Sequence, residues 1–219
     1  LYELSDKEAE ELLTASYNII DGIWIAGLGQ EAIAGIGFIT PIFMILNGVS
    51  VGLGSGATSS ISRFVGAKNH KKASQSAAHS LLIFLIASVV LTIVLLILQE
   101  PLLKLYGASG ESLAQGIKYG TPLFLGLFAF IFANGASGIL RGEGDMKRAM
   151  YAVVVSVILN AILDPICIYI LGWGSAGAAI ATILSSVCSA VVILYWILVK
   201  KDTYVDVNLG EFKFDSSIA

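Results

Sequence analysis

Charged residues are scarce in this 219-residue chain, and their scarcity excludes an ordinary water-soluble domain. Asp, Glu, Lys and Arg make up 13% of the residues, whereas hydrophobic residues make up 56%, and the mean hydropathy is +0.83. A soluble domain carries about 25% charged residues because its surface faces water. No charged residue occurs in the ranges 32–62, 119–140 and 165–199. Each of these runs is long enough to cross a bilayer as a helix, since about 20 apolar residues span the hydrocarbon core.

Cysteine is nearly absent, and the amino terminus is not basic. Cys167 and Cys188 both fall inside apolar runs, so we expect two small core residues rather than a disulfide. A cleavable signal peptide begins with basic residues, whereas this chain begins with acidic ones, so none is predicted. The net charge of −3 points to no particular partner, and we expect no nucleic-acid partner.

Glycine, proline and short polar runs divide the rest of the chain into six predicted helices. Lipid leaves a single chain few alternatives to helices, because every backbone polar group must be bonded internally. The predicted fold class is therefore all-α, a polytopic membrane protein with six transmembrane helices. These helices are expected over residues 6–28, 31–65, 71–99, 111–140, 147–171 and 176–199. We expect the six-helix unit to occupy residues 1–201, and a cytoplasmic tail or linker to occupy residues 202–219.

The basic residues predict how the helices are oriented. Eleven of the thirteen Lys and Arg residues fall at the two ends or in the second and fourth connections, and only Lys104 and Lys118 fall on the other side. Cytoplasmic loops carry an excess of Lys and Arg. Both termini are therefore predicted to be cytoplasmic, which requires an even number of crossings. The expected location is the cell membrane, with the lipid bilayer as a partner.

The first predicted helix is the least apolar of the six. It opens with an acidic run in which Ser5 and Glu8 form a capping-box pattern. Only residues 12–28 remain apolar, and Asp21 interrupts them. We expect this helix to depend on its neighbours for its place in the membrane.

Two aspartates fall inside predicted membrane helices. An ionised carboxylate in hydrocarbon is destabilising by several kcal/mol, so Asp21 and Asp164 are expected to face the bundle interior and to mark an ion or proton pathway. Each has an amide on the same helical face, Asn18 three positions before Asp21 and Asn160 four positions before Asp164. Pro165 has no N–H, so it leaves the carbonyl of Ala161 unpaired. These oxygens suit sodium or a proton; alternatively, each Asp–Asn pair is a structural hydrogen bond between helices.

Other polar and small residues carry weaker signals. The run from Gly52 to Gly56 has three glycines but no following Lys-Ser/Thr, so it predicts close helix packing rather than a phosphate loop. Pro41 and Pro122 predict kinks in their helices. Thr182 alone is more typical of a hydroxyl that bonds to its own backbone. The same holds for Tyr119, Asn134 and Asn47.

Several of these segments, in this order and spacing, resemble the multidrug and toxic compound extrusion (MATE) family of cation-coupled transporters, and in particular its archaeal members. The segments that carry the resemblance are Tyr17-Asn18-Ile19-Ile20-Asp21 with Gly27-Leu28-Gly29, Gly52-Leu53-Gly54-Ser55-Gly56 with Gly66-Ala67, Leu140-Arg141-Gly142-Glu143-Gly144-Asp145, Asn160-Ala161-Ile162-Leu163-Asp164-Pro165, and the run from Gly172 to Thr182.

The resemblance implies the amino-terminal lobe of a fold with two six-helix lobes around a central cavity. It implies export of cationic or amphipathic small molecules in exchange for sodium or protons, with no other cofactor and no enzymatic activity. The family's cation site maps onto Asp21, Asn160, Asp164 and Thr182, with Asn18, Tyr119 and Asn134 as candidates around it. The family has an apolar, proline-containing run where this chain has residues 6–11.

Three alternatives remain open at this stage. The chain stops near the point where a second lobe would begin, so we expect either a cut or altered polypeptide or a half-sized protein that pairs with itself. A lone lobe without transport activity, serving as a folding or assembly unit, is a second possibility. The third is an intramembrane aspartyl protease, because Gly142-Glu143-Gly144-Asp145 matches a Gly-x-Gly-Asp pattern; the basic residues around Asp145, however, predict that it lies at the membrane surface.

Overall fold

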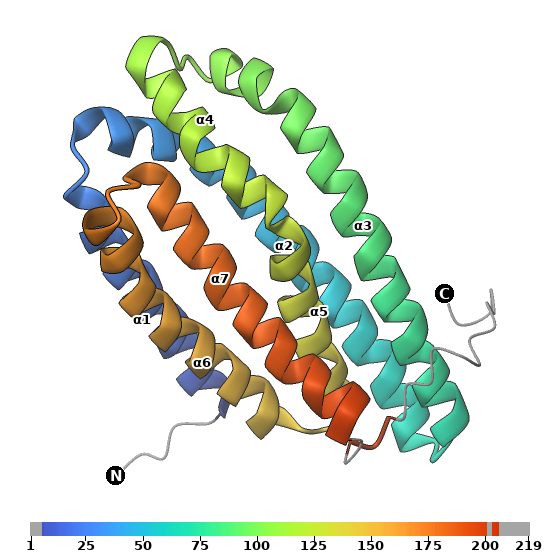
Figure 1. The fold of residues 1–219 in the computed structure, drawn as a ribbon. Helices are drawn as coiled ribbons and strands as arrows, with labels where there is room; N and C mark the ends of the chain where they lie inside the picture. The colour runs from blue at the N-terminus through green and yellow to red at the C-terminus, as the bar shows by residue number, and fades with distance from the viewer. Residues whose placement is uncertain (1–5, 201–202, 206–219) are drawn as a thin grey trace.

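The protein is a bundle of long helices that run roughly side by side (Figure 1). The computed structural model describes residues 6–200 and 203–205; the side chains of residues 6–11, 13–14 and 17–18 lie outside that description. Within the described residues every regular element is a helix. The elements are α1 (Asp6–Ala26), α2 (Gln30–Gly66), α3 (His70–Leu105), α4 (Gly110–Leu125), α5 (Leu127–Gly142), α6 (Met146–Pro165), η1 (Ile166–Ile170), α7 (Ser175–Leu194) and η2 (Tyr195–Lys200).

Most of these helices are long and apolar enough to cross a membrane. Four described spans qualify alone: α2, α3, α6 with η1, and α7 with η2. The pair α4 and α5, bent by 50°, qualifies as a fifth span if it is counted as one. Large apolar side chains such as Met44, Leu105 and Ile170 are exposed, as expected for a surface that faces lipid. The predicted class, an all-helical multi-pass membrane protein, is confirmed.

The first helix forms where it was predicted, but it does not qualify as a span by length and composition. It carries an acidic first turn and Asp21 within its apolar part. α1 packs chiefly against α6, and it makes few contacts with α2, its neighbour in sequence. The expectation that α1 depends on other helices therefore fits its position.

Two predicted boundaries are wrong. α3 continues through Pro101 to Leu105 instead of ending at residue 99, and an ion pair between Lys104 Nζ and Glu100 Oε1 (2.7 Å) joins successive turns across the proline. The predicted helix over residues 111–140 is two helices, because the chain bends at Gly126. Pro122 lacks an N–H at this bend. A Cβ at Gly126 would collide with Ile183 of α7, so only glycine fits there.

Close packing joins α2 to α5 through one glycine of the predicted run. A Cβ on Gly138 of α5 would lie 2.8 Å from the Cα of Gly54, and Thr58 Oγ1 donates a hydrogen bond to the Gly138 carbonyl at 2.8 Å. Gly52 and Gly56 differ, since a Cβ at either would meet no atom within 4 Å. The packing prediction is correct for Gly54 and wrong for its two neighbours.

The two cysteines are both free, as expected, but they occupy different environments. Cys167 is buried beside α7, where a Cβ on Gly177 would lie 2.5 Å from its carbonyl oxygen. Cys188 on α7 is exposed. The prediction that both are core residues is therefore wrong for Cys188.

Candidate cation site

The structure places the two predicted membrane aspartates side by side. Because α1 packs against α6, the carboxyl groups of Asp21 and Asp164 interact directly although they are 143 positions apart in sequence. Asp164 is fully buried, and Asn160, one turn earlier on α6, is 1% exposed. Three of the residues predicted for the cation site thus lie together between the two helices.

The polar atoms of this cluster are only partly satisfied. Asn160 Nδ2 donates to Asp164 Oδ1 over 3.3 Å. Three further oxygens, Asp21 Oδ1, Asn160 Oδ1 and Asp164 Oδ2, are buried and have no hydrogen-bond partner among the described residues. A buried acceptor without a donor is destabilising by about 1–3 kcal/mol. Three such oxygens, two of them from carboxylates, suit a hard cation or a proton that supplies the missing charge.

The neighbouring residues fix how α1 approaches α6. Tyr169 Oη, in the π-helical turn η1, donates to the carbonyl of Trp24 on α1 over 2.6 Å. The two rings meet edge to face with centroids 6.2 Å apart. The turn follows Pro165 directly, so the irregular part of the helix begins at Ile166, two residues after Asp164. These contacts hold Asp21 at the level of Asp164.

Thr182, the fourth predicted ligand, lies on α7. It is 8% exposed, and its Oγ1 donates to the carbonyl of Ala178 over 3.1 Å. The residue lines a cavity of about 220 Å³ that also borders Asn47 of α2 and Asn134 of α5. This hydroxyl therefore serves its own helix in the present arrangement, and its role as a cation ligand stays a prediction.

The residues predicted around the site fall in different places. The backbone of Asn18 lies one turn before Asp21 on α1, but its side chain is outside the described part of the structure. Tyr119 is half-buried and packs against the core from α4. Asn134 Nδ2 donates to the carbonyl of Phe130 over 2.9 Å. None of these contacts tests a part in cation binding.

Metal sites of other kinds are not evident in the described residues, where no three His, Cys, Asp or Glu side chains are grouped to hold an ion. The donors of the candidate site are carboxylate and amide oxygens. Oxygen donors match a hard cation such as sodium rather than a transition metal.

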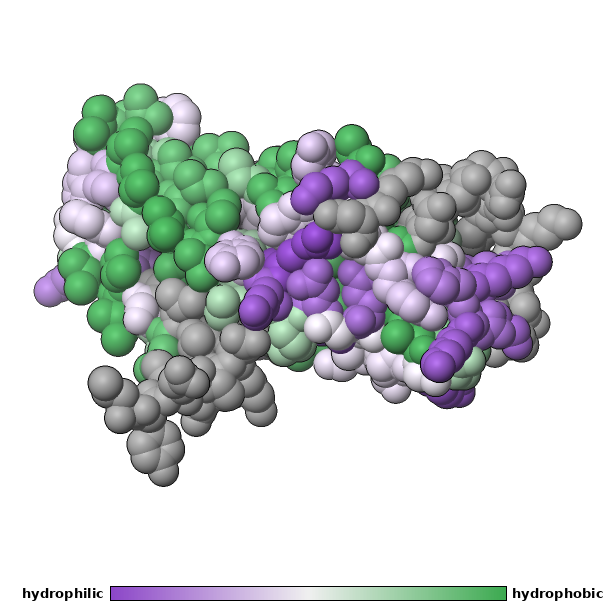
Figure 2. Space-filling view, turned by 90° about the horizontal axis from the view of Figure 1, so that it is seen from below, coloured by the Kyte–Doolittle hydropathy of each residue, from purple (hydrophilic) through white to green (hydrophobic). Residues whose placement is uncertain are grey.

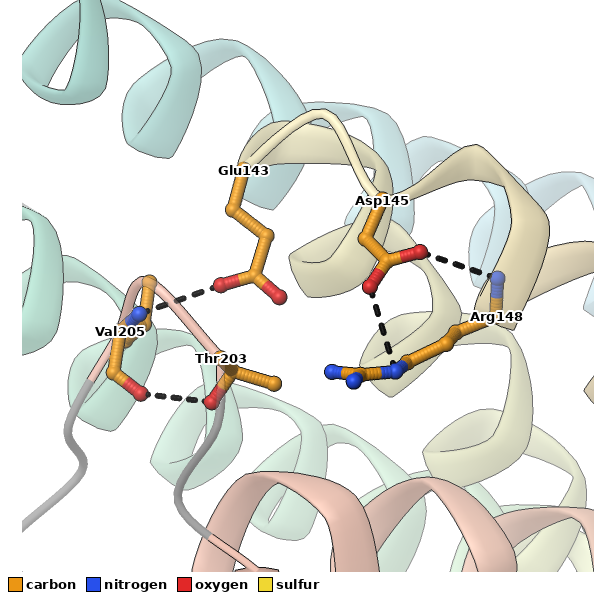
Figure 3. A network of polar contacts seen from close by, with 5 residues as sticks. All are labelled: Glu143, Asp145, Arg148, Thr203 and Val205. Atoms are coloured by element: carbon orange, nitrogen blue, oxygen red, sulfur yellow. Dashed lines mark hydrogen bonds and ion pairs between the residues drawn. The ribbon is translucent and has the colours of Figure 1, made fainter.

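A third acid with a buried carboxyl oxygen was not anticipated from the sequence. Glu143 follows α5, and its Oε2 accepts a hydrogen bond from the backbone N–H of Val205 over 3.1 Å (Figure 3). Val205 is 1% exposed, and Tyr204 before it stacks on His70 with ring centroids 3.7 Å apart. Glu143 Oε1 is buried without a partner among the described residues. Nothing in the local sequence signals this contact, because Val205 lies 62 positions away.

The surroundings of Glu143 change its acidity. Burial, its largest influence, raises the pKa of this carboxyl from 4.5 to about 7, and the nearby charge of Asp145 adds to the rise. The backbone N–H groups of Val205 and Tyr204 and the charge of Arg148 act in the opposite direction. Glu143 therefore titrates near neutral pH.

Asp145, the acid in the Gly-x-Gly-Asp pattern, has a structural role. Its Oδ1 accepts from the Arg148 backbone N–H over 3.1 Å at the start of α6, and its Oδ2 pairs with Arg148 Nε over 3.3 Å (Figure 3). A side chain that caps a helix in this way satisfies a backbone N–H that would otherwise have no partner. Asp145 is far from Asp21 and Asp164 in the bundle, so these contacts do not support the protease alternative.

Comparison with known proteins identifies the chain's relatives. A family model described as MatE matches residues 9–166. The chain is 30% identical over 200 residues to "Multidrug export protein MepA" of Staphylococcus aureus strain NCTC 8325, covering 90% of this chain and 44% of that protein. It is 29% identical over 188 residues to the "FAD transporter" of Shewanella oneidensis MR-1, covering 84% and 42%. The chain thus spans less than half the length of these curated relatives.

Solved structures agree with the sequence matches. The outward-facing conformation of a multidrug resistance MATE family transporter superposes with a TM-score of 0.93 at 44% identity, covering 96% of this chain and 47% of that one. A MOP superfamily transporter from Pyrococcus furiosus superposes with a TM-score of 0.92 at 44% identity, covering 96% and 46%. The family match covers more than two thirds of the sequence and confirms the predicted resemblance: this chain belongs to the MatE family.

Proposed function

We propose that this chain is the cation-binding lobe of a cation-coupled antiporter that exports cationic or amphipathic compounds. The observation that carries the proposal is the group of three buried oxygens without donors, Asp21 Oδ1, Asn160 Oδ1 and Asp164 Oδ2. The name of the MepA relatives, multidrug export proteins, supports the substrate class. Sodium or a proton would supply the positive charge that these oxygens lack.

The two helices that carry the carboxylates provide a route from cation binding to movement. A ligand shifts a conformational equilibrium only if its affinity differs between the two states. Asp21 lies on α1, whereas Asn160 and Asp164 lie on α6, so a displacement of α1 against α6 separates the donor oxygens. The bound cation then favours the arrangement in which α1 and α6 are close. Release of the cation favours the other arrangement, as alternating access requires.

Further parts of the proposal rest on the relatives. The Thr182 hydroxyl would join the cation site by turning away from the Ala178 carbonyl. A second six-helix lobe, or a second copy of this chain, would form the other wall of the substrate cavity, since the solved relatives are about twice as long as the matched region. Both termini would be cytoplasmic, as the distribution of Lys and Arg indicates.

Thermal unfolding of the purified chain in detergent tests the cation site. The melting temperature is measured as NaCl replaces KCl at constant ionic strength, for the parent chain and for Asp21→Asn and Asp164→Asn. A ligand that binds only the folded state stabilises it by about 2.7 kcal/mol at a hundredfold excess over its dissociation constant. We expect a sodium-specific rise that both substitutions abolish.

Two other outcomes are informative. A pH-dependent shift without a sodium effect, lost in the same variants, identifies the proton as the coupling ion. If neither ion matters and the variants melt as the parent does, the proposed site is refuted. Glu111→Gln serves as the control, because Glu111 is an exposed acid in the first turn of α4.

A further inference from the structure

A large cavity lies between α2 and α3, on the opposite side of the bundle from α1 and α6 (Figure 1). Its volume is about 630 Å³. α2 forms one wall between Val49 and Arg63, and α3 forms the other between Ser76 and Phe84. None of the residues proposed for the cation site lines it, so the function of this cavity requires a separate explanation.

Two glycines keep the α2 wall open. A Cβ at Gly52 or Gly56 would meet no atom within 4 Å, so no other helix packs closely against either glycine. Glycine inside a helix is destabilising relative to alanine. Gly54 has a packing partner in α5 that accounts for it, whereas Gly52 and Gly56 have none among the described residues. The effect of these two positions is to hollow the wall of the cavity.

The lining changes from polar to apolar along the cavity. Near the α2–α3 turn it contains Arg63 and the hydroxyls of Ser60 and Ser76, which lie 2.7 Å apart. The other end is lined by Val49 and Phe84. The α2 wall is about 21 Å long, at 1.5 Å per residue. A molecule that fills this cavity has a polar head at the turn and an apolar chain that extends toward the middle of the bundle.

The polar end has an excess of positive charge. Residues 32–99 contain no Asp or Glu, but they contain Arg63, Lys68, Lys71 and Lys72. The Arg63 guanidinium and Lys72 Nζ lie 4.9 Å and 5.8 Å from the centre of the Phe64 ring, so the two helices bring these cations to one place. Viewed from this end of the bundle, a dense group of hydrophilic residues covers the area of the turn (Figure 2). A cluster of cations at a membrane interface attracts anionic lipid headgroups.

We propose that this cavity binds one phospholipid with an anionic headgroup. Its phosphate lies between Arg63 and Lys72, and one acyl chain lies along Gly52 and Gly56 toward Phe84. The proposal depends on the membrane location of the chain but not on the cation site, so failure of either leaves the other intact.

The test uses the purified chain in a neutral detergent, with native mass spectrometry to count retained lipids and thermal unfolding to measure stabilisation. The ligands are dioleoyl phosphatidylglycerol, dioleoyl phosphatidylcholine and inorganic phosphate at equal concentrations. We expect one phosphatidylglycerol to be retained and to raise the melting temperature. It should bind at least tenfold more tightly than phosphatidylcholine. Inorganic phosphate should have no effect, because it cannot occupy the apolar part of the cavity.

Two variants locate the bound lipid. Gly56→Leu fills the cavity, and its side chain starts in open space, so the fold should be kept while phosphatidylglycerol retention falls at least tenfold. Gly37→Leu is the matched control: it is also on α2 and open, but it lies roughly 28 Å away along the helix and should retain the lipid. Arg63→Gln should remove the preference for the anionic headgroup.

Specific results would overturn the proposal. Equal retention of the two lipids would mean that the cations do not select the headgroup. Stabilisation by inorganic phosphate alone would identify a free-anion site. If Gly56→Leu retained phosphatidylglycerol as the parent does, or if the parent chain retained no lipid, the cavity would not be a lipid site.

Discussion

Two pairs of acidic residues in this protein have opposite surroundings. Asp21 and Asp164 lie between α1 and α6 within the apolar part of the bundle, and each has a buried oxygen without a donor among the described residues. Glu143 and Asp145 lie in the connection between α5 and α6, where backbone N–H groups and Arg148 bond to them. Both carboxyl oxygens of Asp145 have partners, whereas Glu143 has a partner for Oε2 but none among the described residues for its buried Oε1, so the contrast with Asp21 and Asp164 is complete only for Asp145.

The contrast between Asp145 and the pair Asp21 and Asp164 separates a structural acid from the two acids that we propose bind a cation. Buried polar groups in native proteins are hydrogen-bonded, and exceptions are associated with an ion, a water molecule or a functional role. Asp145 is satisfied because it caps a helix. Asp21 and Asp164 face each other, so repulsion between two ionised carboxylates would add to the free-energy cost of burying them. Replacing an acid is therefore expected to raise stability at Asp164 and to lower it at Asp145.

The largest expected effect is a gain in stability from Asp164→Asn in the absence of sodium. The amide Nδ2 would replace Asp164 Oδ2 and donate to Asp21 Oδ1, satisfying a buried acceptor that is destabilising by about 1–3 kcal/mol when unpaired. Thermal unfolding in potassium at pH 8 should show a higher melting temperature than that of the parent. A lower one would show that the native carboxylate already has a partner.

Asp145→Ala should have the opposite effect. The substitution removes the helix cap of α6 and the pairing with Arg148, and loss of a cap alone costs about 1 kcal/mol. Asn69→Ala is the matched control, since Asn69 caps α3 by accepting from the Lys72 backbone N–H over 3.1 Å but has no ion pair in the described residues. We expect Asp145→Ala to lower the melting temperature more than Asn69→Ala does. Equal losses would mean that the Arg148 pairing contributes nothing.

Thr182→Val tests whether the candidate site extends to α7. If the hydroxyl is a cation ligand, the sodium concentration that gives half of the stabilisation should rise about fivefold, equivalent to about 1 kcal/mol for one neutral ligand. Ser189→Ala on the same helix is the control, because Ser189 Oγ donates to the Ala152 carbonyl over 3.1 Å. An unchanged sodium dependence would confine the site to α1 and α6.

The effect of Glu143→Gln should appear as a change in the pH dependence of stability. The folded-state pKa of about 7 lies above the ordinary value of 4.5, so the folded protein holds this proton between pH 4.5 and 7. The contribution of Glu143 to stability is therefore greatest below pH 4.5 and is lost as the pH rises through 7. The melting temperature of the parent, measured from pH 5 to 8, should fall relative to that of Glu143→Gln. Parallel curves would contradict the raised pKa.

Much of the fold could be predicted because the membrane constrains it. Charge-free runs define spans, and glycines define connections, so the positions of the helices follow from the sequence. The face of the helix on which a glycine lies also follows from helix geometry: residues four apart share a face, whereas residues two apart do not. Gly52 and Gly56 therefore point away from Gly54, and the prediction that all three pack closely could have been corrected from their spacing alone.

Other features depend on residues that are distant in sequence. The bend at Gly126 is matched to Ile183 of α7, and Glu143 accepts a hydrogen bond from Val205. The sequence placed Asp21 and Asp164 on separate helices and gave each an amide neighbour. Only the family resemblance predicted that the two carboxyl groups meet. Helical periodicity shows which residues share a face of one helix, but it does not show which helices pack together.

The pairing of α1 with α6 also has a consequence for how the protein enters the membrane during its synthesis. α1 is too polar to qualify as a span by its own composition, and its main partner begins about 120 residues later in the chain. At about 5–20 residues per second, the ribosome needs roughly 6–24 s to make the intervening segment. We therefore expect α1 to wait at the membrane surface while later helices insert. The order of insertion then differs from the order of translation, and the joining of α1 to α6 is the step that assembles the paired carboxylates.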